Sequence, residues 1–381
     1  MNGSLFEKTK QMTKDLVVFP SVSDVSNEAI SQFVADQLEA LRFEIEWHQY
    51  VDSKHQTKVS LVAKRGQGSR GVAYLAHTDV VPAEDWSLDF CGPFEAKEAD
   101  QRLYGRGTCD MKGSLACALQ AASSIDPTSQ KSPIYFVVTS DEEVGMLGAQ
   151  LVNSKSKFFQ EMVEGDTLGI VGEPTQLGVY HAHKGGQRLA VRARGRSAHT
   201  STNEGVNANY QLIPALTELL AIREESETNP KYQNSDFDPP TLSWNMTITN
   251  EPEAVNVTTS LAQVNLFLRT MPGVDHSPLL TAIKNLCAEH KLEMEIKDAV
   301  EPWQVPKESS WIQEMLALVG QSESHSVCFA TDAGILQRLK RMLICGPGNI
   351  QQAHRSDEWI SFDQLSKGVD LFTRAFTQMT C

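Results

Sequence analysis

Apolar runs that stop abruptly at polar residues recur along the chain. Four of them end in histidine or acidic residues, at 71–79, 133–143, 168–175 and 341–354. Residues 111–125, between the first two runs, have the small-residue composition of a packed helix. This strand–helix alternation predicts an α/β fold with a central, mostly parallel sheet flanked by helices. The carboxyl ends of such strands border the ligand crevice, so we expect the four polar clusters to converge there.

Residues 183–297 have a different pattern of apolar and polar positions. Segments such as QRLAVRARG and SLAQVNLFLRT alternate apolar and polar residues, which is typical of antiparallel strands. Strands and helices follow one another as β-α-β-β-α-β, which predicts an inserted ferredoxin-like α+β domain. We therefore assign residues 1–182 and 298–381 to one domain and 183–297 to an insertion.

Composition narrows the class of protein. The chain has 381 residues, of which 41% are hydrophobic and 22% charged, as in soluble globular proteins of two domains. A net charge of -14 argues against binding to nucleic acid backbones. Without an apolar run of about 18 residues, no membrane span is expected. The seven cysteines form no C-x-x-C pair, which disfavours a thiolate zinc site and favours a reducing, cytoplasmic location.

The first two polar clusters contain candidate metal ligands. His77 and Asp79 form H-x-D at a strand end, where His77 could bind a metal while Asp79 holds its other ring nitrogen. An ordinary polar strand end explains the same pattern. Asp110 lies in the glycine-flanked segment GRGTCDMKG, and its carboxylate could bridge two cations. A helix N-cap is the alternative for that aspartate.

The later clusters add further candidates of the same chemical type. Glu142 and Glu143 belong to an acidic triplet that is costly to bury unless a cation neutralises it or the triplet faces water. Glu173 in GEPT and His354 in QQAHRSDE follow two other strands. Imidazole and carboxylate ligands without cysteine suit a hydrolytic zinc, cobalt or manganese site.

Seven segments carry a family resemblance, in chain order: AHTDVVP, YGRGTCDMKG, TSDEEVGMLGA, GEPT, GRSAHTS, LRTMPG and GPGNIQQAHRSDE. They resemble the motifs of the zinc-dependent aminoacylase/carboxypeptidase family over nearly the whole chain. That family contains acetylornithine deacetylases, succinyl-diaminopimelate desuccinylases and glutamate carboxypeptidases. HKGGQ, DFDPP, ATDAGILQ and GPGNIQQAH are similar to the acetylornithine deacetylases in particular.

The resemblance implies a metal ligand set, position by position. His77 and Glu173 correspond to the ligands of one zinc, and Glu143 and His354 to those of the other. Asp110 corresponds to the carboxylate that bridges them. The implied cofactors are therefore two divalent ions, with zinc favoured and cobalt as an alternative.

The resemblance also implies roles beyond the ligands. Glu142 corresponds to the general base and Asp79 to the partner of the first histidine. In the inserted domain, His199 corresponds to a histidine that crosses a dimer interface to stabilise the oxyanion. Arg269 and Asn256 correspond to substrate-binding residues. Without the resemblance, the sequence around His199 favours a residue in a surface turn. The sequence around Arg269 favours a residue that pairs locally at the end of a strand.

The expected activity is hydrolysis of the amide bond of an N-acyl amino acid in a homodimeric enzyme. N-acetylornithine, split into ornithine and acetate for arginine biosynthesis, is the favoured substrate. N-succinyl-diaminopimelate, another N-acyl amino acid and a dipeptide remain alternatives, because ITNEPEAVNVTTS departs from the usual family form. A catalytically silent binding protein on the same fold is the alternative of another class.

Overall fold

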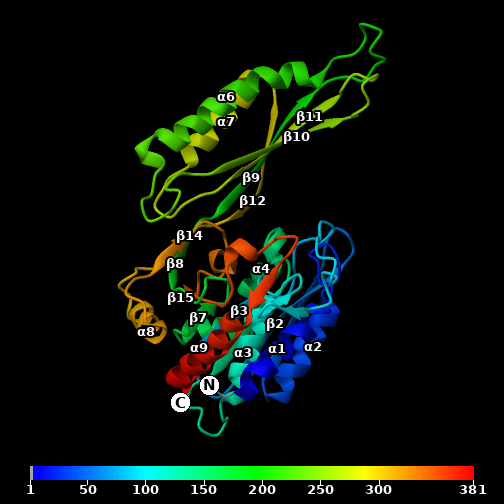
Figure 1. Cartoon of the computed structure of the whole chain (residues 1–381). Helices are drawn as coiled ribbons and strands as arrows, with labels where there is room; N and C mark the ends of the chain where they lie inside the picture. Colours follow the sequence, from blue (N-terminus) through cyan, green and yellow to red (C-terminus); the bar gives the residue numbers. More distant parts are fainter. Residues whose placement is uncertain (1–2) are drawn as a thin grey trace. The chain divides into compact units, whose positions relative to one another are not determined.

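The computed structural model describes residues 3–381, which divide into two compact units. The first unit contains the described residues up to His181 with Val305–His325 and Thr331–Cys381; the second contains Ala182–Gln304 and Ser326–Ala330. Figure 1 labels the elements of both. The second unit is longer than the insertion expected at 183–297. Its extra segment is held by a hydrogen bond of 3.1 Å from the Lys184 N–H to the carbonyl of Val327.

The larger sheet has nine strands in the order β1-β2-β6-β3-β7-β15-β8-β13, with β14 paired to β8. Their bounds are β1 (Glu44–Val51), β2 (Thr57–Arg65), β3 (Val72–His77), β6 (Ile134–Thr139), β7 (Leu168–Val171), β8 (Tyr180–His183), β13 (Trp303–Gln304), β14 (His325–Val327) and β15 (Arg341–Ile344). The central strands of the sheet are parallel: β3 pairs in parallel with β6 and with β7, and β7 pairs in parallel with β15. These central strands are buried on both faces, which explains their continuous apolar runs.

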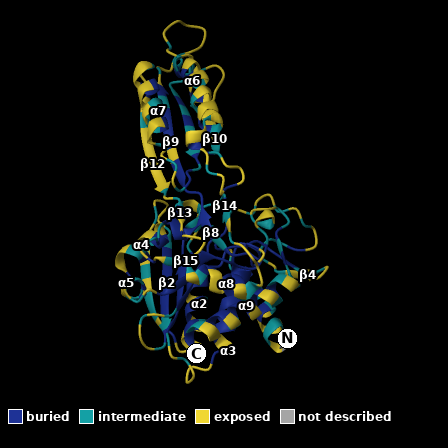
Figure 2. Ribbon diagram, turned by 90° about the vertical axis from the view of Figure 1, so that its left-hand side faces the viewer, coloured by how far each residue is buried: buried dark blue, intermediate teal, exposed yellow. Residues whose placement is uncertain are grey.

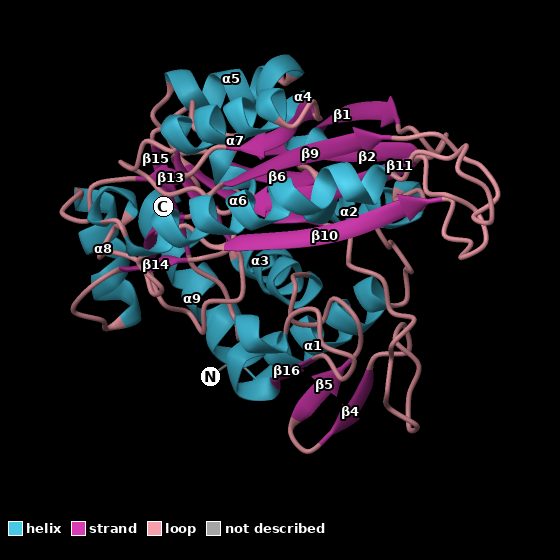
Figure 3. Ribbon diagram, turned by 90° about the horizontal axis from the view of Figure 1, so that it is seen from above, coloured by secondary structure: helices cyan, strands magenta, loops and turns pink. Residues whose placement is uncertain are grey.

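Helices cover both faces of this sheet. The set comprises α1 (Gly3–Val17), α2 (Glu28–Ala40), α3 (Lys112–Ser124), α4 (Leu147–Lys155), α5 (Lys157–Glu164), α8 (Ser310–Val319) and α9 (Phe362–Thr380). Figure 3 shows α4 and α5 on the side opposite α1, α3 and α9. On the α9 face, the ring of Tyr74 packs 5.7 Å from Phe136 and 5.2 Å from Phe372. A small antiparallel sheet, β16-β5-β4, completes the unit with β4 (Lys97–Ala99), β5 (Arg102–Tyr104) and β16 (Trp359–Ser361).

The second unit is a four-stranded antiparallel sheet with two helices. Its elements follow in chain order β9 (Gly186–Arg194), α6 (Ala208–Thr228), β10 (Trp244–Glu251), β11 (Leu261–Leu268), α7 (Ser277–Glu289) and β12 (Glu293–Val300). The strands lie in the order β10-β11-β9-β12. This β-α-β-β-α-β order is the ferredoxin-like pattern, so the predicted fold class is confirmed.

Each unit has its own core of buried residues, and Figure 2 draws all buried residues in dark blue. In the second unit, alternate residues of β11 such as Val264 and Leu266 pack against α6 and α7 through Leu212 and Ile283. Within residues 3–381, none of the helices combines the length and the apolarity needed to cross a membrane.

Candidate metal centre

The parallel strands bring the polar clusters to one edge of the sheet. His77 is the last residue of β3 and lies in register with Thr139, the last residue of β6. The acidic triplet follows Thr139 directly, and Glu173 comes two residues after β7 ends at Val171. Gly172 is needed before this glutamate, because a Cβ there would lie 2.1 Å from the hydroxyl of Tyr74.

The acidic triplet is shaped by a tight turn. Asp141 has a left-handed φ of 58°, and the short 3₁₀ helix η1 (Glu142–Val144) follows it. Helix α4 approaches the end of β6 so closely that a Cβ on Gly148 would lie 2.4 Å from the carbonyl oxygen of Ser140. The glycine therefore allows the helix to close over this loop.

Asp110 and His354 come from loops that border the same edge. The carboxylate of Asp110 presents one oxygen to each histidine: Oδ1 lies 3.2 Å from Nε2 of His77, and Oδ2 lies 3.4 Å from Nε2 of His354. Nε2 of His354 is also 3.1 Å from Glu143, and Nε2 of His77 is 3.9 Å from Glu173. Two groups of side chains that could hold a metal ion thus share a single aspartate.

The ligand atoms of each group lie within 4.8 Å of one another, which suits a metal ion. One group contains His77, Asp110 and Glu173, and the other contains Asp110, Glu143 and His354. These are the two sets that the family resemblance implies. Oxygen and imidazole ligands around a shared carboxylate are chemically suited to a pair of zinc or cobalt ions.

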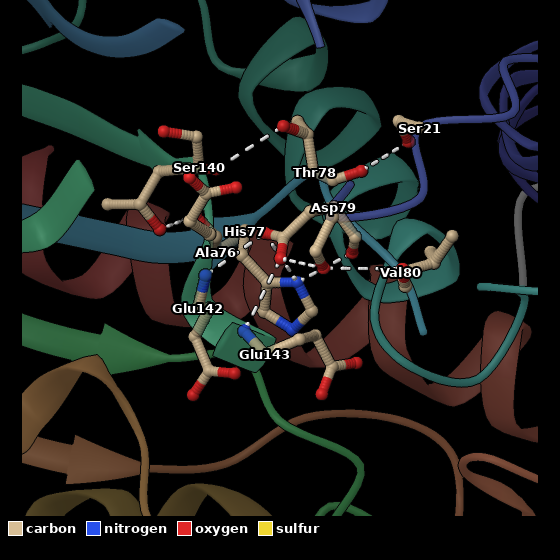
Figure 4. A network of polar contacts seen from close by, with 12 residues as sticks. Ser21, Ala76, His77, Thr78, Asp79, Val80, Ser140, Glu142 and Glu143 are labelled. Atoms are coloured by element: carbon tan, nitrogen blue, oxygen red, sulfur yellow. Dashed lines mark hydrogen bonds and ion pairs between the residues drawn. The ribbon is translucent and has the colours of Figure 1, made fainter. Parts of the chain in front are cut away.

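Asp79 connects the first histidine to the acidic loop, but through two different groups. Nδ1 of His77 lies 2.9 Å from the backbone carbonyl of Asp79 and 3.7 Å from its carboxylate. The carboxylate instead accepts the backbone N–H groups of Glu142 and Glu143, at 3.2 and 3.3 Å, and the hydroxyl of Ser23 at 2.8 Å. Figure 4 shows both glutamate side chains directed to the same side.

The buried carboxylates of the candidate centre favour a positive charge beside them. Burial raises the pKa of Glu142 well above its usual range, and the nearby carboxylates of Glu173, Asp332 and Glu143 push it in the same direction. Burial also raises the pKa of Glu173. A cation bound beside these groups would stabilise their charged form.

Contacts between the histidines and the carboxylates of the centre also shift pKa values. Hydrogen bonds to Asp110 and Glu143 raise the pKa of His354 to about 10. Burial alone would raise the pKa of Asp110, but hydrogen bonds from His354 and His77 outweigh it and bring that pKa below its usual range. Contacts with both histidines therefore favour the charged form of Asp110, which suits a carboxylate shared by two cations.

Asp332 is an acidic residue of this edge that sequence reasoning did not single out. Its Oδ2 accepts a hydrogen bond of 2.5 Å from Thr139, while Oδ1 is buried and has no hydrogen-bond partner among residues 3–381. Burial raises the pKa of Asp332 to about 7. The only signal for it was its place in ATDAGILQ, a segment chosen for its family resemblance and not for its chemistry.

The remaining predicted site residues belong to the second unit. His199 is exposed, and its Nδ1 lies 2.7 Å from the hydroxyl of Ser201. Asn256 is close to it in the fold, because the N–H of Thr200 donates to the carbonyl of Asn256 at 3.3 Å. Arg269 follows β11, and its guanidinium carbon lies 4.5 Å from the ring centroid of Phe267.

A parallel-centred α/β unit with histidine and carboxylate groups gathered at one edge of its sheet is the arrangement expected of a metal-dependent hydrolase. Residues 73–378 match the model of peptidase family M20/M25/M40, so the chain belongs to that family and is a hydrolase of peptides or N-acyl amino acids. This confirms the resemblance seen in the motifs.

Individual relatives agree in length with this chain. It is 31% identical over 366 residues to the acetylornithine deacetylase of Proteus mirabilis, covering 92% of this chain and 91% of the relative. It is 30% identical over 381 residues to that of Erwinia tasmaniensis, covering 96% of both. The structure of human carnosine dipeptidase 1 superposes with a TM-score of 0.75 at 17% identity, covering 99% of this chain and 97% of that one, which supports the fold.

Proposed function

We propose that the chain is a dinuclear metal hydrolase that removes the acyl group from an N-acyl amino acid, with N-acetylornithine favoured as substrate and zinc as metal. The observation that carries this proposal is Asp110, whose two oxygens face two different histidines. The relatives named acetylornithine deacetylase favour this substrate among the family's amides.

In this proposal one ion is held by His77, Asp110 and Glu173, and the other by Asp110, Glu143 and His354. The bound ions would polarise the amide carbonyl and lower the pKa of a water molecule. The carbonyl of Asp79 can only accept, so a neutral His77 must carry its proton on Nδ1. Nε2 then keeps its lone pair for a metal.

Glu142 acts as the proposed general base. It belongs to neither ligand group, and its backbone N–H is anchored on the carboxylate of Asp79. A free carboxylate beside the ligands takes a proton from the attacking water and delivers it to the leaving amine. Asp79 thereby orients both the histidine ligand and the base.

The second unit supplies the proposed substrate contacts. The guanidinium of Arg269 binds the substrate carboxylate through two parallel hydrogen bonds. Asn256 offers a polar group beside His199, which stabilises the oxyanion in the site of a partner subunit. The exposure of His199 on its own unit is consistent with such a contact.

A homodimer is part of the proposal, because it supplies that partner. Helix α6 exposes the apolar residues Tyr210, Ile213 and Leu220 on one side, and Tyr210 is 76% exposed. The neighbouring β10 is an edge strand of its sheet and exposes Ile248. An exposed apolar stripe beside an unpaired strand edge suits association with a second copy. Replacing Ile213 by aspartate should produce monomers in sedimentation analysis, and an unchanged dimer would contradict this surface.

A substrate panel tests the chemistry. Purified protein is stripped of metal, reloaded with zinc or cobalt, and assayed for amine release from N-acetylornithine, N-succinyl-diaminopimelate, other N-acetyl amino acids and dipeptides. We expect the highest kcat/KM for N-acetylornithine. Turnover confined to a succinyl or peptide substrate would replace the favoured assignment, and metal binding without any turnover would favour the silent binding protein.

A further inference from the structure

A buried ion pair lies beside the candidate metal centre, at motif positions that the proposed function leaves without a role. Nη1 of Arg106 is 2.9 Å from Oε2 of Glu358, and each side chain is 1% exposed. Arg106 belongs to YGRGTCDMKG, and Glu358 ends GPGNIQQAHRSDE. Burying two such charges is expensive unless they are paired and hydrogen-bonded, so their partners indicate what the pair does.

Glu358 organises the loop that carries Asp110. Its Oε2 accepts the N–H of Gly107 at 2.9 Å, and its Oε1 accepts those of Cys109 at 2.8 Å and Asp110 at 3.1 Å. Gly107 has a φ of +83°, which lets the loop turn around the carboxylate. The backbone at Asp110 is thus fixed by a residue that is not itself in either ligand group.

Arg106 connects this loop to two other segments that carry candidate ligands. Its Nη2 donates to the carbonyl of Pro82 at 3.1 Å, five residues after His77. Its Nη1 donates to the carbonyl of Arg355 at 3.0 Å, the residue after His354. One ion pair therefore contacts three segments, and each segment contains a histidine or aspartate of the centre.

We infer that Arg106 and Glu358 are positioning residues of the metal centre, which hold the segments of His77, Asp110 and His354 at the spacing that two ions require. The inference rests on the proposed function, because it takes these three residues as ligands. A merely structural pair would stabilise the fold alone. A positioning pair also raises metal affinity, since residues behind the ligands typically change it by about 10- to 100-fold.

The test measures zinc affinity on folded, metal-free protein by competition with a chromophoric chelator, together with the melting temperature of the metal-free protein. Glu358→Gln keeps the shape of the side chain but turns one acceptor oxygen into a donor that faces backbone N–H groups. We expect the zinc dissociation constant to rise by about 10- to 100-fold. Arg106→Lys should give a smaller rise, because one ammonium cannot reproduce the planar fork.

Arg65→Lys is the matched control. Arg65 is also a buried arginine that donates to two backbone carbonyls, those of Leu41 at 3.2 Å and Ala122 at 3.0 Å. It lies opposite Ile134, at the start of β6, so it is at the other end of that strand from the centre. This control should lower the melting temperature and leave zinc affinity unchanged.

The outcomes separate the inference from the proposed function. An unchanged zinc affinity in Glu358→Gln, with a melting temperature lowered as in the control, overturns the inference. If Glu358→Gln does not fold, a loss of affinity in Arg106→Lys but not in Arg65→Lys supports it, and equal affinities overturn it. A wild-type protein that takes up no zinc overturns the proposed metal function as well.

Discussion

Replacing Lys58 by methionine removes a buried cation from behind the acidic loop of the candidate centre. Lys58 lies on β2, is 1% exposed, and places Nζ 2.9 Å from Oδ1 of Asp141. It also donates to the carbonyls of Ser23 at 2.6 Å and Val25 at 2.8 Å. The substitution therefore leaves a buried carboxylate without its cation, at the residue that starts the turn into Glu142–Val144.

The expected loss of stability follows from these contacts. Methionine has a similar shape, so the main loss is the unpaired charge, for which breaking a buried pair costs about 3–5 kcal/mol. The hydroxyl of Tyr50 still donates to Asp141, which favours the lower end of that range. A control on the same strand is Lys64→Met, whose pair with Glu161 has side chains that are 16% and 32% exposed. Such a partly exposed pair contributes only about 0–1 kcal/mol.

Urea unfolding of the metal-free protein at pH 7 measures both variants. We expect the free energy of unfolding of Lys58→Met to be about 3 kcal/mol below wild type, with the denaturant slope unchanged. The double variant Lys58→Met/Asp141→Asn should recover part of the loss, because the carboxylate is then neutral. If Lys58→Met and Lys64→Met agree within about 0.5 kcal/mol, the argument from the buried pair is refuted.

Three further predictions concern pH dependence, the base and the substrate. Burial lowers the pKa of His183 from 6.5 to about 4, so the unfolded chain takes up a proton first as pH falls. The free energy of unfolding of the wild type should therefore fall by up to about 3 kcal/mol between pH 6.5 and 4, and that of His183→Gln, measured by urea titration, should lack this fall. The same pH dependence in both proteins would contradict the prediction. Glu142→Gln should lower kcat by about 10²- to 10⁴-fold at unchanged metal content by elemental analysis, whereas near-normal turnover would exclude it as base. Arg269→Lys should raise KM about tenfold with a smaller effect on kcat, because lysine lacks the bidentate fork; an unchanged KM would remove Arg269 from carboxylate binding.

The sequence was informative where a pattern is local. His77 and Glu173 follow apolar runs that stop abruptly, and the parallel pairing of β3 with β7 places the ends of these runs together. The alternation in β9 and β11 likewise predicted the antiparallel second unit, because alternate residues of a strand face opposite sides of the sheet.

The supporting contacts could not be predicted, because they depend on distant backbone. Glu358 belongs to the charged stretch HRSDE, which is typical of a protein surface, yet its side chain is buried. Its carboxylate accepts N–H groups from a loop that includes Gly107, 251 residues earlier in the chain. Lys58 occupies a strand position where lysine usually faces water, and only its contacts with Asp141 and the loop at Ser23 explain its burial. For Asp79, H-x-D indicated a carboxylate contact to His77, whereas the local backbone offers the carbonyl at the shorter distance.

Metal stoichiometry tests the central claim, that Asp110 is shared between two ions, most directly. Wild-type protein and Asp110→Ala are dialysed to equilibrium against zinc, and bound metal is counted by elemental analysis. The account predicts about two ions per wild-type chain and the loss of at least one in Asp110→Ala, because both groups lose a ligand. A wild-type chain that binds fewer than about one ion, or an Asp110→Ala chain that still binds two, would contradict it.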